Sequence, residues 1–251
     1  MISDLRQGTF SNKLNKKFGK LDVLKDIDLE CNKGQCIALI GPNGCGKTTL
    51  IKSILGMVLP DKGNIEYEGK SVLGEYLYRE KIGYMPQIGR FPDNMKASRL
   101  IQMMKDIRNA DENTDEELFK AFQIESIGQK TMQSLSGGTR QKVNATLAFL
   151  FNPEVLILDE PTAGLDPVSS EILKQKIIRE ATDGKLVLIT SHILSDLEDV
   201  ATNVIYLQEG KIHFSDSLEN IQEYTGQIRL GKAIAQLMQQ GFRKDIQSFI
   251  K

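Results

Sequence analysis

The sequence predicts an α/β fold with a doubly wound core, a small antiparallel β layer and an inserted helical lobe. Cys36–Ile40 is a short, unbroken apolar run, which is typical of a strand covered on both faces. Similar runs occur later in the chain, at Val155–Leu158, Leu186–Thr190 and Val204–Leu207. From 88 to 151 the patterns are helical instead, and no strand is evident there.

Strand and helix alternate in the predicted core. Apolar residues at 50, 51, 54 and 55 share one face of a helix expected at Lys47–Leu55, and Gly56 ends it. A second helix is expected at Ser169–Ala181, between two of the apolar runs. This alternation predicts a parallel sheet with helices on its faces.

The other elements are expected outside the parallel sheet. Gly63–Gly69 alternates and is closed by glycines, which favours a hairpin in the β layer together with the N-terminal strands. The lobe is expected to hold helices at Ala97–Arg108, Glu116–Phe122 and Thr139–Phe151, and Asp111–Glu117 is interpreted as a solvated loop and helix start. Leu230–Met238 predicts an amphipathic helix with residues 230, 234, 237 and 238 on one face. We therefore expect an α/β core at 1–87 and 152–215, the helical lobe at 88–151 and a helical tail at 216–251.

Composition excludes several classes of protein. The 251 residues are 40% hydrophobic and 26% charged, and the net charge of −1 does not favour nucleic acid or an anionic membrane surface. No window reaches the ~18 apolar residues of a membrane span, and no basic segment followed by an apolar one opens the chain. We expect a cytoplasmic protein that works at a membrane only through a partner.

The cysteines predict reduced thiols. Residues 31, 36 and 45 form no CxxC pair, and one would be left over if two formed a disulfide. A metal site made of Cys31, Cys36 and His213 is the alternative.

The segment Gly41-Pro-Asn-Gly-Cys-Gly-Lys-Thr48 stands between the first predicted strand and its helix. Its glycines let backbone N–H groups turn inward around a phosphate, and the helix directs its positive end at the same anion. Lys47 would contact the β- and γ-oxygens, and Thr48 would offer its hydroxyl to Mg²⁺. The core is therefore predicted to be that of a P-loop NTPase. Its expected nucleotide contacts are Gly41, Pro42, Asn43, Gly44, Cys45, Gly46, Lys47, Thr48 and Thr49.

Asp159 and Glu160 directly follow the apolar run Val155–Leu158. A buried strand would deliver both carboxylates at its C-terminal end, where such sheets bind ligands. Asp159 would hold a water on Mg²⁺, and Glu160 would orient and polarise the attacking water. The alternative is an acidic helix start, although Pro161 favours a sharp exit from the strand.

Ser136, Gly137 and Gly138 precede a helical pattern and predict a second anion site. Serine is a good N-cap, and the glycines leave the first helix amides exposed. One chain can hardly use both anion sites for one nucleotide. Two chains would therefore share each ATP, with Ser136 of one capping the γ-phosphate bound by the other; a simple helix cap is the alternative.

Four further residues are candidates for contact with the nucleotide. Gln87 would touch the metal or its water where the core passes into the lobe, unless it is only a polar hinge. His192 would contact the γ-phosphate from the end of the run Leu186–Thr190, although a lone histidine is more often structural. Asp166 would lie at the seam between two chains. Phe18 could stack on adenine or be a core aromatic.

In this order, these motifs resemble those of the ATP-binding subunits of ABC transporters. The resemblance covers nearly all of residues 14–215, and Thr139 and Phe18 depart from the glutamine and tyrosine usual in the family. It implies a homodimer or heterodimer that sandwiches ATP and Mg²⁺ and docks on an integral membrane permease at the inner face of the cell membrane. The helical lobe would receive a coupling element of that permease.

A closer resemblance is to the ATPases of copper-processing complexes that mature nitrous-oxide reductase. It rests on Leu55–Pro60, Tyr84–Arg90, Met104–Arg108 and Leu147–Pro153. The residues themselves do not point to copper, because the chain has two histidines and no paired cysteines. An ABC exporter with another cargo is one alternative.

Two further alternatives lie outside transport. A soluble ABC protein of DNA repair or translation usually has two cassettes or a long coiled coil, and a P-loop kinase leaves Leu135–Gln141 unexplained. We expect no nucleic-acid partner, because the charge lacks a basic bias.

Overall fold

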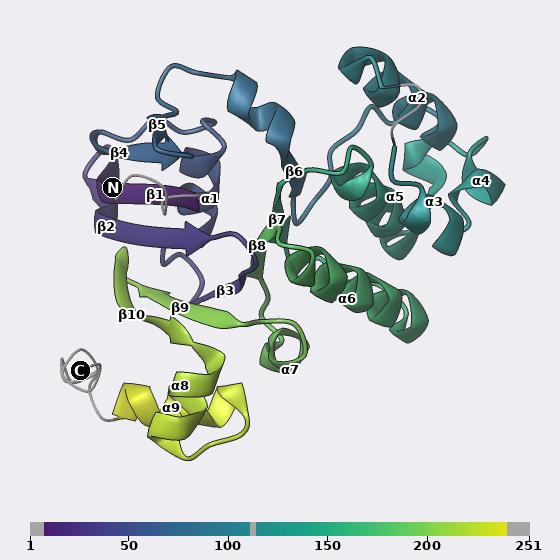
Figure 1. Ribbon diagram of the computed structural model, residues 1–251. Helices are drawn as coiled ribbons and strands as arrows, with labels where there is room; N and C mark the ends of the chain where they lie inside the picture. Colours follow the sequence, from purple (N-terminus) through teal and green to yellow (C-terminus); the bar gives the residue numbers. More distant parts are fainter. Residues whose placement is uncertain (1–7, 111–113, 240–251) are drawn as a thin grey trace. The chain divides into compact units, whose positions relative to one another are not determined.

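The computed structural model describes residues 8–110 and 114–239, which form two compact units (Figure 1). Unit 1 consists of the described parts of Met1–Cys31, Cys36–Leu73 and Ser191–Lys251. Unit 2 consists of Asn32–Gln35 and the described parts of Gly74–Thr190. The two ends of the chain thus contribute to one unit and its middle to the other.

Unit 1 contains the β layer, a four-stranded sheet in the order β2-β1-β4-β5. Its strands are β1 (Gly8–Phe18), β2 (Leu21–Asn32), β4 (Lys62–Tyr67) and β5 (Lys70–Ser71). The predicted hairpin is confirmed, since β4 and β5 pair antiparallel. The polar first strand pairs antiparallel with β4, and its register shifts between Asn12 and Asn15.

Unit 1 also contains three strands in the order β10-β9-β3. The predicted strand β3 (Cys36–Ile40) is buried along its length and runs parallel to β9 (Asn203–Gln208). Burial raises the pKa of the Cys36 thiol to about 12, so the reduced thiol stays protonated. The antiparallel strand β10 (Lys211–Ser217) was not predicted, because its polar residues hide an edge strand.

The described part of unit 1 has four helices, of which two were predicted. Helix α1 (Lys47–Ile54) is followed by Gly56 at φ 65°, as predicted. The short α7 (Leu194–Glu198) and α8 (Leu218–Thr225) were not predicted. Helix α9 (Leu230–Gln239) packs against α7 and α8 and buries residues 230, 234 and 237 (Figure 1). Met238, also predicted on that face, is 45% exposed, and its sulfur accepts from the Tyr206 hydroxyl of β9 at 3.5 Å.

Unit 2 contains a parallel sheet in the order β8-β7-β6. The predicted strands β7 (Val155–Asp159) and β8 (Leu186–Thr190) are buried along their length, and their register places Asp159 opposite Thr190. Strand β6 (Ile82–Met85) was not predicted. A Cβ at Gly83 would lie 2.1 Å from the Ala148 carbonyl oxygen, so this strand packs backbone to backbone against a helix.

That helix is α5 (Gly137–Phe149), one of several in unit 2. The others are α2 (Ala97–Arg108), α3 (Glu117–Ala121), α4 (Ile124–Ile127) and α6 (Pro167–Thr182), with two short 3-10 helices, η1 (Leu77–Lys81) and η2 (Met132–Ser134). Helix α2 has the predicted bounds. The described residues between 88 and 151 form no strand, apart from an isolated bridge between Lys96 and Thr131. Among the described residues, no helix has both the length and the apolar character that crossing a membrane requires.

A buried ion cluster ties α6 to the start of α3. Lys176 is 5% exposed, and its ammonium contacts Asp115, Glu117 at 3.0 Å and Glu180 at 2.7 Å. Burial opposes the charge of Lys176, but the hydrogen bonds to the three carboxylates outweigh it and raise its pKa. The interpretation of this acidic stretch as a solvated loop and helix start is confirmed for Glu117, which is exposed and begins α3, but Asp115 is partly buried in the cluster. Residues 111–113 lie outside the described residues.

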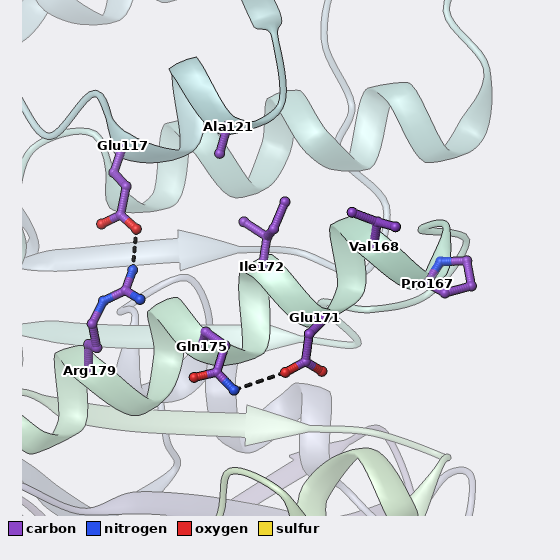
Figure 2. A pocket seen from close by; sticks show the side chains of 8 residues that line it. All are labelled: Glu117, Ala121, Pro167, Val168, Glu171, Ile172, Gln175 and Arg179. Carbon is purple, nitrogen blue, oxygen red and sulfur yellow. Dashed lines mark hydrogen bonds and ion pairs between the residues drawn. The ribbon is translucent and has the colours of Figure 1, made fainter.

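A groove of about 610 Å³ separates α3 from α6 beside this cluster (Figure 2). Val168 and Ile172 are among its apolar lining residues, and hydrogen bonds join Arg179 to Glu117 and Gln175 to Glu171 along it. None of the predicted site residues lines the groove.

Candidate functional site

The predicted site residues are divided between the two units. Unit 1 holds Phe18, His192 and the loop of residues 41–49. Unit 2 holds Gln87, Asp159, Glu160, Asp166 and the three residues 136–138.

The loop of unit 1 has the strand–loop–helix context that a phosphate site requires, since β3 precedes it and α1 follows. Gly41 has φ 150°, and a Cβ there would lie 1.9 Å from the Leu207 carbonyl oxygen. Only glycine therefore fits against β9. The Lys47 ammonium donates to the carbonyl oxygens of Gly41 at 2.7 Å and Pro42 at 3.2 Å, which holds its charge over the loop.

In unit 2, the acidic pair lies at the C-terminal end of β7, as predicted. Asp159 and Glu160 are each 7% exposed. No helix begins at the pair, because α6 starts only at Pro167, and the acidic helix start is excluded. The Thr190 hydroxyl donates to Asp159 Oδ1 at 2.6 Å. Burial and then the charge of Asp159 raise the pKa of nearby Tyr84.

The backbone of Glu160 is strained. Its φ is 53°, in the left-handed region, which costs a residue other than glycine roughly 1–3 kcal/mol. The Glu160 N–H donates to Thr190 O at 3.2 Å and Thr190 Oγ1 at 3.1 Å. The Glu160 carbonyl accepts from Gln141 Nε2 at 3.0 Å and from the Ala163 N–H at 3.2 Å. These bonds hold the strained conformation.

Ser136 is the N-cap of α5, as predicted, although the helix begins at Gly137 and ends at Phe149, two residues before each predicted bound. The Ser136 hydroxyl accepts from the Thr139 N–H at 3.2 Å and lies 2.8 Å from the Thr139 hydroxyl. The two glycines differ. Gly137 is exposed and has open space beside it, whereas a Cβ at Gly138 would lie 2.4 Å from the Gly164 carbonyl oxygen. Gly138 therefore lets α5 pack against the segment that follows Glu160.

Two more residues of α5 contact that segment, and sequence reasoning missed both. Gln141 donates to Glu160, as described, and the Lys142 ammonium lies 2.8 Å from Asp166 Oδ2. Asp166 is the N-cap of α6 and accepts from the Ser169 N–H at 2.9 Å. The hydrogen bonds from Lys142 and then Ser169 hold the pKa of Asp166 well below its usual range.

The other candidates lie at the surface. Gln87 is exposed just after β6, and Asn144 of α5 holds the preceding Pro86 carbonyl at 2.9 Å. His192 is exposed just after β8. Phe18 ends β1 and is 50% exposed, which excludes a core aromatic.

The cysteines are confirmed as free thiols, and all three are buried. Within the described ranges, no group of three or more histidine, cysteine, aspartate or glutamate side chains is placed to hold a metal ion. The alternative site of Cys31, Cys36 and His213 therefore has no support.

Residues 24–163, which contain the phosphate loop, α5 and the acidic strand, match the model of the ABC transporter family. The chain belongs to this family. It is 32% identical over 215 residues to the lantibiotic transport ATP-binding protein SrtF of Streptococcus pyogenes. The aligned residues cover 84% of this chain and 92% of that relative.

Solved ABC cassettes have the same fold. An ATP-binding subunit of an ABC transporter superposes with a TM-score of 0.84 at 26% identity, over 92% of this chain and 99% of that one. A dimeric cassette in a post-hydrolysis state, bound to ADP and phosphate, superposes with a TM-score of 0.75 at 23% identity, over 84% of this chain and 98% of that one. The predicted P-loop NTPase fold is confirmed. ABC cassettes are ATPases, and this chain is an ATP-binding ATPase.

Proposed function

We propose that two copies of this chain close around two ATP and that hydrolysis drives a conformational change in a membrane permease. Each nucleotide would lie between the loop of residues 41–49 of one copy and residues 136–138 of the other. Ser136 and Gly137 support this assignment, because they are exposed at the N-terminus of α5, where helix amides favour an anion.

Within each half of the dimer we assign roles by chemistry. Glu160 orients the attacking water, with Gln87 and His192 beside the γ-phosphate. Phe18 stacks on adenine, and Asp166 lies at the seam between copies. Hard oxygen ligands suit Mg²⁺, and the Thr48 hydroxyl and Asp159 carboxylate supply them. The hydrogen bond from Thr190 orients that carboxylate, as supporting bonds do for metal ligands. Bound Mg²⁺ would neutralise charge on the phosphates.

Replacing Lys47 by alanine is expected to weaken ATP binding about 10–100-fold, because a charge-assisted contact is worth ~1.5–3 kcal/mol. Titration of a fluorescent ATP analogue measures the affinity. Lys52→Ala, an exposed lysine on the same helix, is the matched control and should bind as wild type does. Equal ATP affinity in the Lys47 variant and wild type would contradict the assignment of phosphate binding to this loop.

Coupling to the permease rests on one observation, a groove of about 430 Å³ in unit 2. It is lined by the segment that follows Gln87 and by α5, which contributes Arg140, four residues after Ser136. Ile88 is 70% exposed there. A permease element in this groove would touch both the segment next to Gln87 and the helix that carries Ser136. The full lining is Ile88, Gly89, Arg90, Phe91, Pro92, Asp93, Met132 and Arg140.

Ile88→Asp tests this docking site. A charge in the groove is expected to abolish co-purification with the permease from detergent-solubilised membranes, while thermal stability stays that of wild type because the side chain is 70% exposed. Leu77→Asp is the control, since Leu77 is 58% exposed in the same unit but outside the groove. Association that survives Ile88→Asp, or that is lost equally in both variants, contradicts the site.

The kind of complex to which this chain belongs is inferred from the resemblance of four sequence segments to copper-processing ATPases. We therefore propose a cytoplasmic location at the inner face of the membrane and a permease of such a complex, with copper handled by the partners. Isolation of the complex and metal analysis of its separated subunits tests this. Copper bound to a partner supports it, whereas a partner that carries a peptide or another solute points to a different exporter.

A further inference from the structure

Two buried polar side chains hold the main chain of Glu160 in unit 2. Gln141 lies on α5 and is 6% exposed, and Thr190 ends β8 and is 0% exposed. We propose that both are positioning residues for ATP hydrolysis, which together set the direction of the Glu160 carboxylate. This inference rests on the role of Glu160 given above.

Gln141 anchors the peptide that follows Glu160. Its Nε2 group donates to the carbonyl oxygens of Glu160 at 3.0 Å and Pro161 at 3.4 Å. Both carbonyls belong to the turn that leaves β7. A buried amide with two such acceptors has little freedom to move, and it orients the peptide plane on the C-terminal side of the Glu160 Cα atom.

Thr190 anchors the peptide on the other side. Its hydroxyl accepts from the Glu160 N–H at 3.1 Å and donates to Asp159 Oδ1 at 2.6 Å. The hydroxyl therefore uses its donor and an acceptor position at once. With the planes on both sides held, the backbone stays at φ 53° and the Cα–Cβ bond of Glu160 points in one direction.

Gln141 also joins Glu160 to the helix that carries Ser136. Helix α5 contacts the segment after β7 in three places, through Gly138 against the Gly164 carbonyl, Gln141 against Glu160, and Lys142 against Asp166. A displacement of α5 therefore changes the position of Glu160. The carboxylate would reach its working position only when α5 is placed by the γ-phosphate at its N-terminus.

Two near-isosteric variants test the proposal. Gln141→Met and Thr190→Val remove the hydrogen-bonding groups and keep the volume. Since a displacement of about 1 Å in an active site can cost about 10²-fold, we expect kcat for ATP to fall about tenfold or more, with KM unchanged. Thr190→Ser keeps the hydroxyl and should restore kcat. Thr146→Val is the control, because that buried hydroxyl of α5 bonds within the helix, to Lys142 O at 2.9 Å.

A double-mutant cycle separates positioning from structural damage. If Gln141 acts through Glu160, Gln141→Met should not lower further the residual turnover of Glu160→Gln. The same fold loss in both backgrounds, a raised KM, or an equal loss in Thr146→Val would overturn the inference. A normal kcat in Gln141→Met beside an inactive Glu160→Gln would overturn it while leaving the proposed function intact. Normal turnover in Glu160→Gln would instead contradict the proposed function, because Glu160 would then not orient the attacking water.

Discussion

Glu160→Gln is expected to lower ATP turnover about 10²–10⁴-fold, the usual contribution of a positioned acid–base group. Glutamine keeps the size and the main-chain hydrogen bonds of Glu160 but cannot accept a proton from water. ATP binding should persist, because the phosphate loop belongs to the other unit and is unaltered. The ATP-bound state should therefore accumulate.

Two measurements on this variant check the sandwich. Phosphate release gives turnover, and gel filtration with ATP should show a dimer that wild type forms only transiently. Glu171→Gln, an exposed carboxylate on α6, is the matched control and should keep turnover within about twofold of wild type. A variant that stays monomeric with ATP would contradict the sandwich for the isolated chain.

Lys176→Met is expected to destabilise the protein by about 3 kcal/mol, the lower end of the range for a buried ion pair that loses one partner. Methionine fills the same space but removes the ammonium that all three carboxylates share, while Arg179 still pairs with Glu117 and Lys185 with Glu180. Glu180 is only 7% exposed, whereas Glu117 is 44% exposed and water screens it, so the loss stays at the lower end. Equilibrium urea unfolding measures the change in free energy.

The control for this variant lies on the same helix. Arg179→Met removes a cation that is 51% exposed and pairs with Glu117, so it should cost less than about 1 kcal/mol. Equal losses in the two variants would show that the cluster adds nothing beyond a surface pair.

The cluster also predicts a pH dependence. Burial alone would raise the pKa of Asp115, but the hydrogen bonds from Lys176 and the Glu117 N–H outweigh it and lower that pKa. Its stabilising contribution is therefore present above about pH 4 and is lost as the pH falls below that value. The Lys176→Met variant should lose most of this dependence.

Motifs that are contiguous in the chain could be predicted from the sequence. The phosphate loop, the Ser136 cap and the acidic pair after β7 each depend on neighbours within a few residues, and their local structures came out as expected. Strands β6 and β10 were missed, since one is only four residues long and the other is polar. Neither has the apolar run that a covered strand shows.

The supports of Glu160 could not be predicted, because they join residues distant in sequence. Thr190 lies opposite Asp159 only through the register of β7 and β8. Gln141 is one polar residue among several on α5, and the sequence pattern of the helix does not show that this side chain is buried, at 6% exposed. Lys176 similarly looks like part of a solvated helix face until Asp115 and Glu117, at the start of α3, supply carboxylates from outside the helix.

The stretch Ser136–Gly138 shows the same division at one site. By itself the sequence determined that a serine caps α5 and that glycines leave its first amides open, because capping is decided within one helical turn. Only the tertiary structure decided that Gly137 faces open space while Gly138 packs against Gly164, and that Gln141 and Lys142 hold the residues after β7. The physical reason is that a side chain's partners depend on which backbone lies within a few ångströms, and this follows from packing between elements.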